Sequence, residues 1–213
     1  MSEELERKNI DKTKIDWNEH AAYWDNWDEA RDYTKQTFGL LTEKINLDNL
    51  NILDFGSGTG ILTEYMAKSE KQVVAVDTSE KMIEVLSNKK LNNVVTIVGQ
   101  LSKETISTHS ILKDKFDLIV ASSVCAFLPN YEEVLTIIKS LLKPNGIFVQ
   151  WDWLQKDAEP DFGFTEDMIR ESYKFVGLKI ESINIPFSFI ENEEKMDVIM
   201  AIGKSDKPLF TNR

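Results

Sequence analysis

Residues 51–60 are Asn51-Ile52-Leu53-Asp54-Phe55-Gly56-Ser57-Gly58-Thr59-Gly60. The first half of this stretch is a short apolar run with one acid, which predicts a buried parallel strand. Three alternate glycines follow, and a glycine lets a ligand lie directly against the backbone. Residues 61–68 then place apolar side chains at helical spacing. The stretch therefore predicts a strand, a glycine turn and a helix, the nucleotide-binding corner of a doubly wound α/β sheet.

The spacing of the glycines separates the possible ligands of this corner. A dinucleotide-binding loop has the pattern G-x-G-x-x-G, whereas Gly56, Gly58 and Gly60 give G-x-G-x-G and position 61 is Ile. Asp54 stands just before the turn, where a carboxylate repels a phosphate and attracts a cationic ligand. The pattern therefore makes a nicotinamide-dependent oxidoreductase the less favoured interpretation.

A second acid follows the next predicted strand, residues 72–77. Asp77 ends this strand, at about the distance from Gly56 where an acidic residue accepts hydrogen bonds from ribose hydroxyls. Two carboxylate oxygens match the two hydroxyls of a vicinal diol. Ser79 and its neighbours are typical of a cap for the helix that begins near Lys81.

Two later segments complete a pattern. Residues 116–123 read Phe-Asp-Leu-Ile-Val-Ala-Ser-Ser, and residues 141–149 contain the turn Leu-Leu-Lys-Pro-Asn-Gly. Together with 51–60 and 72–78, they resemble the motifs of class I methyltransferases that use S-adenosyl-L-methionine (SAM), of the type that acts on small molecules. The resemblance implies one Rossmann-like α/β domain with a seven-stranded, mostly parallel sheet, helices on both faces and an antiparallel last strand.

The resemblance also implies cofactor-binding residues. The glycine loop would pack on the methionine part of SAM, Asp77 would hold the ribose, and Met82, Gln100 and Leu101 would border the adenine. The full set is Tyr23, Trp24, Asp54, Gly56, Ser57, Gly58, Gly60, Asp77, Thr78, Met82, Gln100, Leu101, Ala121 and Ser122. Gln100 stands where the family usually has an acid, and Ala126 and Phe127 stand where it frequently has histidines.

The region before the glycine corner predicts a helical cap. Trp17, Tyr23, Trp24 and Trp27 follow a charged leader and precede the first strand. We expect a flexible leader over 1–16, a methyltransferase domain over 17–203 that starts with this cap at 17–46, and a polar tail over 204–213. The aromatic residues of the cap are either a lid over the cofactor or a static patch over the edge of the sheet.

Composition bounds the remaining possibilities. The 213 residues suffice for one well-buried domain, and the net charge of −11 disfavours a nucleic-acid partner. No apolar run approaches the length of a membrane span. Cys125 is the single cysteine, and His20 and His109 have no metal-type spacing partner. We expect a cytoplasmic protein, a monomer or a homodimer, without a metal.

The expected reaction is in-line transfer of a methyl group from SAM to a small-molecule acceptor. Because the sulfonium is already activated, the protein mainly aligns the reactants and excludes water. No catalytic residue is assigned; Asp152 and Tyr23 are the candidate bases, and Asp152 with Trp151 and Trp153 is a candidate substrate wall. A protein acceptor and a catalytically silent SAM-binding protein remain alternatives. The acceptor and its attacking atom (N, O, S or C) stay open.

Overall fold

The structure is a computed structural model that describes residues 15–68, 72–156, 162–191 and 194–206. Most of the predicted leader and of the predicted tail lies outside the described residues.

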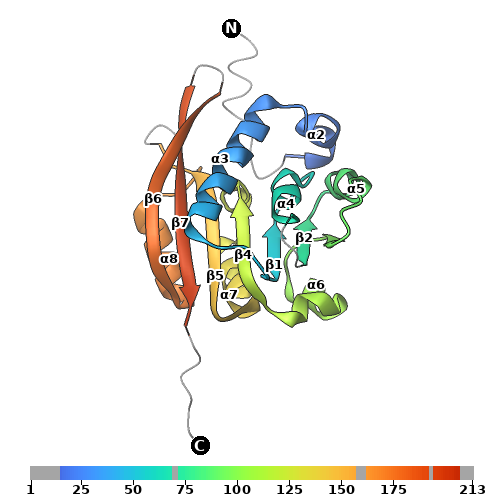
Figure 1. The fold of residues 1–213 in the computed structure, drawn as a ribbon. Coiled ribbons are helices and arrows are strands. Elements are labelled where there is room, and N and C mark those ends of the chain that lie inside the picture. Colours follow the sequence, from blue (N-terminus) through green and yellow to red (C-terminus); the bar gives the residue numbers. More distant parts are fainter. Residues whose placement is uncertain (1–14, 69–71, 157–161, 192–193, 207–213) are drawn as a thin grey trace, which may run out of the picture.

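One seven-stranded sheet organises the chain (Figure 1). Its strands are β1 Ile52–Phe55, β2 Val73–Asp77, β3 Val94–Val98, β4 Phe116–Ser122, β5 Leu142–Trp153, β6 Leu178–Glu191 and β7 Glu194–Ser205. The order is β3-β2-β1-β4-β5-β7-β6, in which the neighbouring strands from β3 to β5 are parallel and β7 is antiparallel to β5 and to β6. This confirms the predicted fold class.

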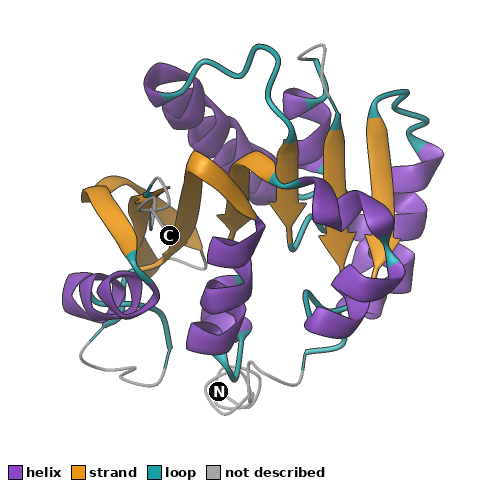
Figure 2. Ribbon diagram, turned by 90° about the horizontal axis from the view of Figure 1, so that it is seen from below, coloured by secondary structure: helices purple, strands orange, loops and turns teal. Residues whose placement is uncertain are grey.

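Helices cover both faces of this sheet (Figure 2). They are α2 Trp17–Trp24, α3 Asp28–Lys44, α4 Ile61–Met66, α5 Glu80–Asn88, α6 Lys103–Thr108, α7 Tyr131–Leu141 and α8 Glu166–Val176, with short 3-10 helices η2 Ser110–Asp114 and η3 Cys125–Phe127. Ser79 caps α5, because its hydroxyl accepts a hydrogen bond from the backbone N–H of Met82. None of the helices in the described part of the chain is long and apolar enough to cross a membrane.

The alternation of side chains along β1 explains where its one acid points. Leu53 and Phe55 are buried in the core cluster that contains the inner face of α7. Ile52 is buried in the other cluster, against α3 and α4. Successive residues of a strand point to opposite faces of the sheet, so Asp54 shares the face of Ile52. There Thr63 of α4 donates a hydrogen bond to its carboxylate at 2.5 Å.

The topology places a site at the carboxyl ends of β1, β2 and β4. The chain leaves β1 for β2 on one side, while β4 lies on the other side of β1. Such a reversal of strand order is where open α/β sheets bind ligands. Figure 1 shows α2 beyond these strand ends, next to α5.

Candidate functional site

A cleft of about 970 Å³ lies at these strand ends. Most of the cofactor-binding residues implied by the resemblance line it: Trp24, Asp54, Gly56, Ser57, Gly58, Asp77, Thr78, Met82, Gln100, Leu101 and Ser122. Three others do not. Tyr23 points into solvent with 65% of its surface exposed, and Ala121 is fully buried in the core. Gly60 is buried under the loop, as the N-cap of α4.

The three glycines of the loop have different roles, although all have positive φ angles. A Cβ at Gly56 would lie 2.5 Å from Cγ2 of Val124, and one at Gly60 would lie 2.2 Å from Cδ1 of Leu86. Both positions therefore exclude side chains because the protein itself packs there. A Cβ at Gly58 would meet nothing nearer than the indole nitrogen of Trp24, at 4.0 Å. Gly58 thus leaves open space toward the cleft, where a ligand has room to approach the backbone.

Asp77 fixes this loop. Its carboxylate accepts hydrogen bonds from the backbone N–H of Gly58 at 2.8 Å and from that of Ser79 at 2.9 Å. Burial raises the pKa of Asp77, while these backbone bonds act in the opposite direction. A carboxylate can accept about four hydrogen bonds, so Asp77 retains the capacity to accept one from a ribose hydroxyl.

Asp54 brings a second carboxylate to the same cleft. Burial raises the pKa of Asp54 to about 7, and the nearby negative charge of Asp77 adds to this shift, while the hydrogen bond from Thr63 opposes it. Among the described residues, neither Asp54 nor Asp77 forms an ion pair. Two acids without a paired cation favour a positively charged ligand.

The cap closes this part of the cleft. Trp17, Trp24 and Trp27 form a chain of ring contacts, with centroids 5.8 Å and 5.3 Å apart, and all three line the cleft. Polar bonds hold α2 in place. The side chain of Asn18 accepts hydrogen bonds from the Ser79 hydroxyl and the Lys81 N–H, at 2.9 and 3.2 Å.

A second set of polar contacts joins the end of α2 to the glycine loop. Asp25 accepts a hydrogen bond from the Thr59 hydroxyl and forms an ion pair with Lys89 at 2.8 Å. Ala21 is the one residue of α2 that is buried, so α2 is held mainly by these partly buried polar contacts and by the ring contacts of its tryptophans.

The far end of the cleft is aromatic, and the sequence indicated it only in part. Of the predicted substrate wall, Trp153 lines the cleft, whereas Trp151 and Asp152 are fully buried and do not. Asp152 accepts a hydrogen bond from the N–H of Ala126 at 3.1 Å, and burial raises its pKa to about 7. Since Tyr23 is also outside the lining, neither candidate base lies on the cleft.

Several lining residues were missed by the sequence interpretation: Tyr33, Ser123, Phe127 and Phe189. Phe127 was noted only as the replacement of a histidine; its ring contacts Trp17 edge-on at 5.1 Å. Ser123 has a positive φ of 53° directly after β4, which turns the chain at the edge of the cleft. A sequence pattern gives no signal for such a turn at a serine.

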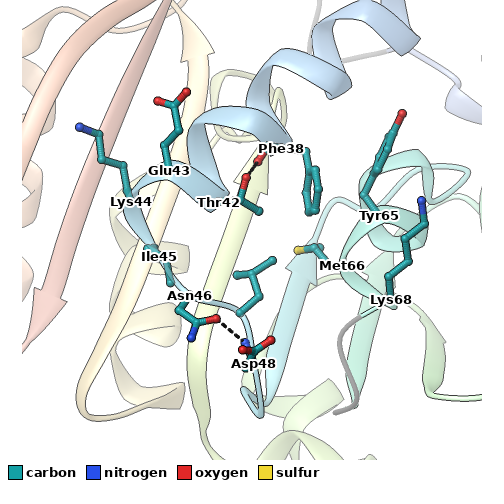
Figure 3. A pocket seen from close by; sticks show the side chains of 11 residues that line it. Phe38, Thr42, Glu43, Lys44, Ile45, Asn46, Asp48, Tyr65, Met66 and Lys68 are labelled. Atoms are coloured by element: carbon teal, nitrogen blue, oxygen red, sulfur yellow. Dashed lines mark hydrogen bonds between the residues drawn. The ribbon is translucent and has the colours of Figure 1, made fainter.

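A second, more open hollow lies between the end of α3 and α4 (Figure 3). Phe38 and Tyr65 stack there with ring centroids 5.0 Å apart, and Lys68 lies over the Tyr65 ring. None of the residues implied by the resemblance lines this hollow. The larger cleft is therefore the candidate active site.

Comparison with known proteins agrees with this geometry. A family model described as a methyltransferase domain matches residues 23–193. The ubiquinone biosynthesis O-methyltransferase of Pasteurella multocida is 28% identical over 156 residues, which cover 66% of this chain and 64% of that protein. The chain thus spans less than two thirds of this relative's length.

Solved structures show the same fold at low sequence identity. A Synechocystis magnesium protoporphyrin IX methyltransferase with bound S-adenosylhomocysteine has a TM-score of 0.63 and 16% identity, and the match covers 81% of this chain and 82% of that one. A putative methyltransferase, solved with a Haloferax volcanii methyltransferase activator, has a TM-score of 0.71 and 14% identity, over 90% and 96% of the two chains. The fold and the position of the cleft are those that the resemblance to class I SAM-dependent methyltransferases implies. This chain belongs to the methyltransferase domain family.

The two glycines Gly58 and Gly60 should separate binding from folding. We expect Gly58→Ala to weaken SAM binding at least tenfold, because the added methyl group enters the cleft. The cost in stability should be modest, because it comes only from placing an alanine at the positive φ of 55°. Gly60→Ala should lower the free energy of unfolding by roughly 1–3 kcal/mol, because its methyl group overlaps Leu86. Calorimetric titration and urea unfolding measure the two effects. Unchanged SAM affinity in Gly58→Ala would mean that the ligand does not approach this loop.

SAM affinity should depend on pH through Asp54. The raised pKa means that the empty protein favours protonated Asp54, so its stability falls as pH rises from about 4 to about 7. A cationic ligand favours the carboxylate, so the affinity should rise with pH and be roughly tenfold weaker one unit below the pKa. Asp54→Asn should flatten the profile between about pH 5.5 and 7.5, whereas Asp152→Asn, outside the cleft, should keep it. Identical profiles in wild type and Asp54→Asn would contradict this assignment.

Proposed function

We propose that this protein transfers the methyl group of SAM to a small-molecule acceptor. The observation that carries the proposal is the continuity of the cleft, which runs from the glycine loop and Asp77 past Ser122 to an aromatic end at Trp153. Its volume of about 970 Å³ is at the upper end of the range for ligand sites. It therefore suits a cofactor and a small acceptor side by side.

The residues present fit the cofactor. Asp77 would hold the ribose, and Asp54 would face the positively charged part of the ligand. The Ser57 hydroxyl is buried and makes no hydrogen bond with the described residues, so it is available to the polar end of a ligand. Met82 and Leu101, both buried, offer apolar contact to a flat base. When bound, SAM supplies an activated methyl group, whose bond to sulfur breaks as an acceptor lone pair bonds to carbon and any acceptor proton leaves to solvent.

The protein's own contribution is alignment and exclusion of water. Trp17, Trp24 and Phe127 cover the cleft with apolar surface, and large aromatic rings do so at a low entropic cost. Neither candidate base lies on the cleft, and no histidine is among the residues that line it. This agrees with a reaction in which position, rather than proton transfer, dominates the rate.

A small acceptor is favoured over a protein chain because α2 and α3 cover the cleft. The names of two similar proteins point the same way: one is a ubiquinone biosynthesis O-methyltransferase and the other a magnesium protoporphyrin IX methyltransferase. A silent SAM-binding protein is separated from an enzyme by turnover. Formation of S-adenosylhomocysteine with a small-molecule extract is the expected result, and binding without any turnover would favour the silent protein.

Ligand binding tests the first step. SAM at about 100 Kd should raise the free energy of unfolding by roughly 2.7 kcal/mol, whereas NADH should not. Asp77→Asn should weaken the affinity for SAM at least tenfold, because it loses a ribose acceptor and loosens the Gly58 loop. Asp114→Asn, outside the cleft, is the matched control. Stabilisation by NADH alone would contradict the proposal.

We also propose that α2 opens to admit SAM. The support is its attachment through Asn18 and Asp25 rather than through a buried apolar face. Saturating SAM should slow proteolytic cleavage within 15–30, and Asp25→Ala should speed cleavage of the empty protein. Equal cleavage rates with and without SAM would leave a static aromatic patch.

A further inference from the structure

The aromatic end of the cleft is a compartment built by segments that are far apart in the sequence. Tyr33 comes from α3, Trp153 from the end of β5 and Phe189 from β6, and all three line the cleft. The Trp153 and Phe189 rings stack with centroids 5.8 Å apart, and Tyr33 lies 5.6 Å from Trp153 and 6.3 Å from Phe189. We call Tyr33, Ser123, Trp153 and Phe189 the aromatic compartment. Aromatic side chains of this kind offer a large apolar contact area to a ring.

Two hydroxyl groups in this compartment are not fully satisfied by hydrogen bonds. The oxygen atoms of Tyr33 and Ser123 are buried, and neither forms a hydrogen bond of ordinary geometry with the described residues. The two side chains nevertheless lie close enough to interact, with Ser122 beside them. Burial raises the pKa of Tyr33, so this hydroxyl stays neutral and can donate. Buried hydroxyls that are poorly satisfied are costly, and a ligand oxygen within reach of both would improve their hydrogen bonding.

The charges of the cleft restrict the ligand further. The acidic residues that line it are Glu29, Asp54, Asp77, Glu104 and Glu133, and Lys103 is the one basic residue among the described lining residues. An acceptor with a phosphate or carboxylate group would be repelled. A neutral molecule would not be.

We infer that Tyr33 and Ser123 bind an oxygen of a neutral, ring-containing acceptor whose ring packs against Trp153 and Phe189. The inference rests on the proposed function, since it names the substrate class of the same cleft. It assigns Tyr33 and Ser123 as specificity-determining residues, and neither carries a proton transfer.

Binding of ring probes tests this assignment. The protein saturated with S-adenosylhomocysteine is titrated with 2-naphthol, naphthalene and 2-naphthoate, and quenching of tryptophan emission gives the affinities. We expect 2-naphthol to bind best and 2-naphthoate worst. Tyr33→Phe and Ser123→Ala should each weaken 2-naphthol about fivefold, the value of one neutral hydrogen bond, and leave naphthalene unchanged. Trp153→Ala should weaken both.

A stability measurement separates this role from a structural one. Tyr33→Phe removes a hydroxyl that makes no hydrogen bond of ordinary geometry with the described residues, so the empty variant should be about as stable as wild type. Tyr173→Phe is the matched control, because the buried Tyr173 hydroxyl bonds Oε1 of Gln150 at 3.2 Å; it should lower the melting temperature and leave 2-naphthol binding unchanged.

Three results would overturn the inference: no binding of 2-naphthol, equal affinity in wild type and Tyr33→Phe, or a preference for 2-naphthoate. Calorimetric titration of the same variants with SAM distinguishes failure of this inference from failure of the proposed function. Intact SAM binding together with any of these results rejects the acceptor class and leaves the proposed function standing. Absence of SAM binding by the wild type rejects the proposed function itself.

Discussion

The carboxylate of Asp77 joins three segments on which the cleft depends. Asp77 is the last residue of β2. Its carboxylate accepts hydrogen bonds from the N–H of Gly58, in the loop after β1, and from the N–H of Ser79, at the start of α5. Ser79 in turn is bonded to Asn18 of the cap. One partly buried acid thus sets the shape of the glycine loop and, through α5, the place where the cap is attached.

The same acid gives the empty cleft an electrostatic cost. Asp54 is buried and Asp77 partly buried, and this loss of hydration raises both pKa values, while no ion pair among the described residues offsets it. A ligand with a sulfonium and an ammonium group would supply that charge. The two acids therefore lower the stability of the empty protein slightly. They also favour binding of a cationic nucleoside over a phosphate-bearing dinucleotide.

Local signals predicted the structural elements at the glycine-loop end of the cleft. The strand and glycine loop at 51–60, the acid at Asp77 and the cap at Ser79 are each encoded within a few neighbouring residues. The sequence could not show that the three glycines of the loop have different roles, because Gly60 is required by the packing of Leu86, which lies in another helix. For the same reason Ala121, on a strand buried on both faces, shares the motif of Ser122 without reaching the cleft.

The aromatic end of the cleft escaped prediction because it depends on long-range packing. Tyr33 meets Trp153 and Phe189 only after the sheet has brought α3 beside β5 and β6. Alternation along β5 explains the outcome at the predicted wall: Trp151 and Trp153 share one face, only the terminal Trp153 reaches the cleft, and Asp152 points to the opposite face toward η3. The sequence named the right strand end and could not choose among its residues.

A crystal structure with S-adenosylhomocysteine tests the central claim most directly, namely that the two acids and the glycine loop form the cofactor site. The account predicts density for the ribose beside the Asp77 carboxylate, with the amino-acid end of the ligand along Gly56 and Gly58. Density in the hollow between Phe38 and Tyr65, or a ribose held away from Asp77, would contradict it.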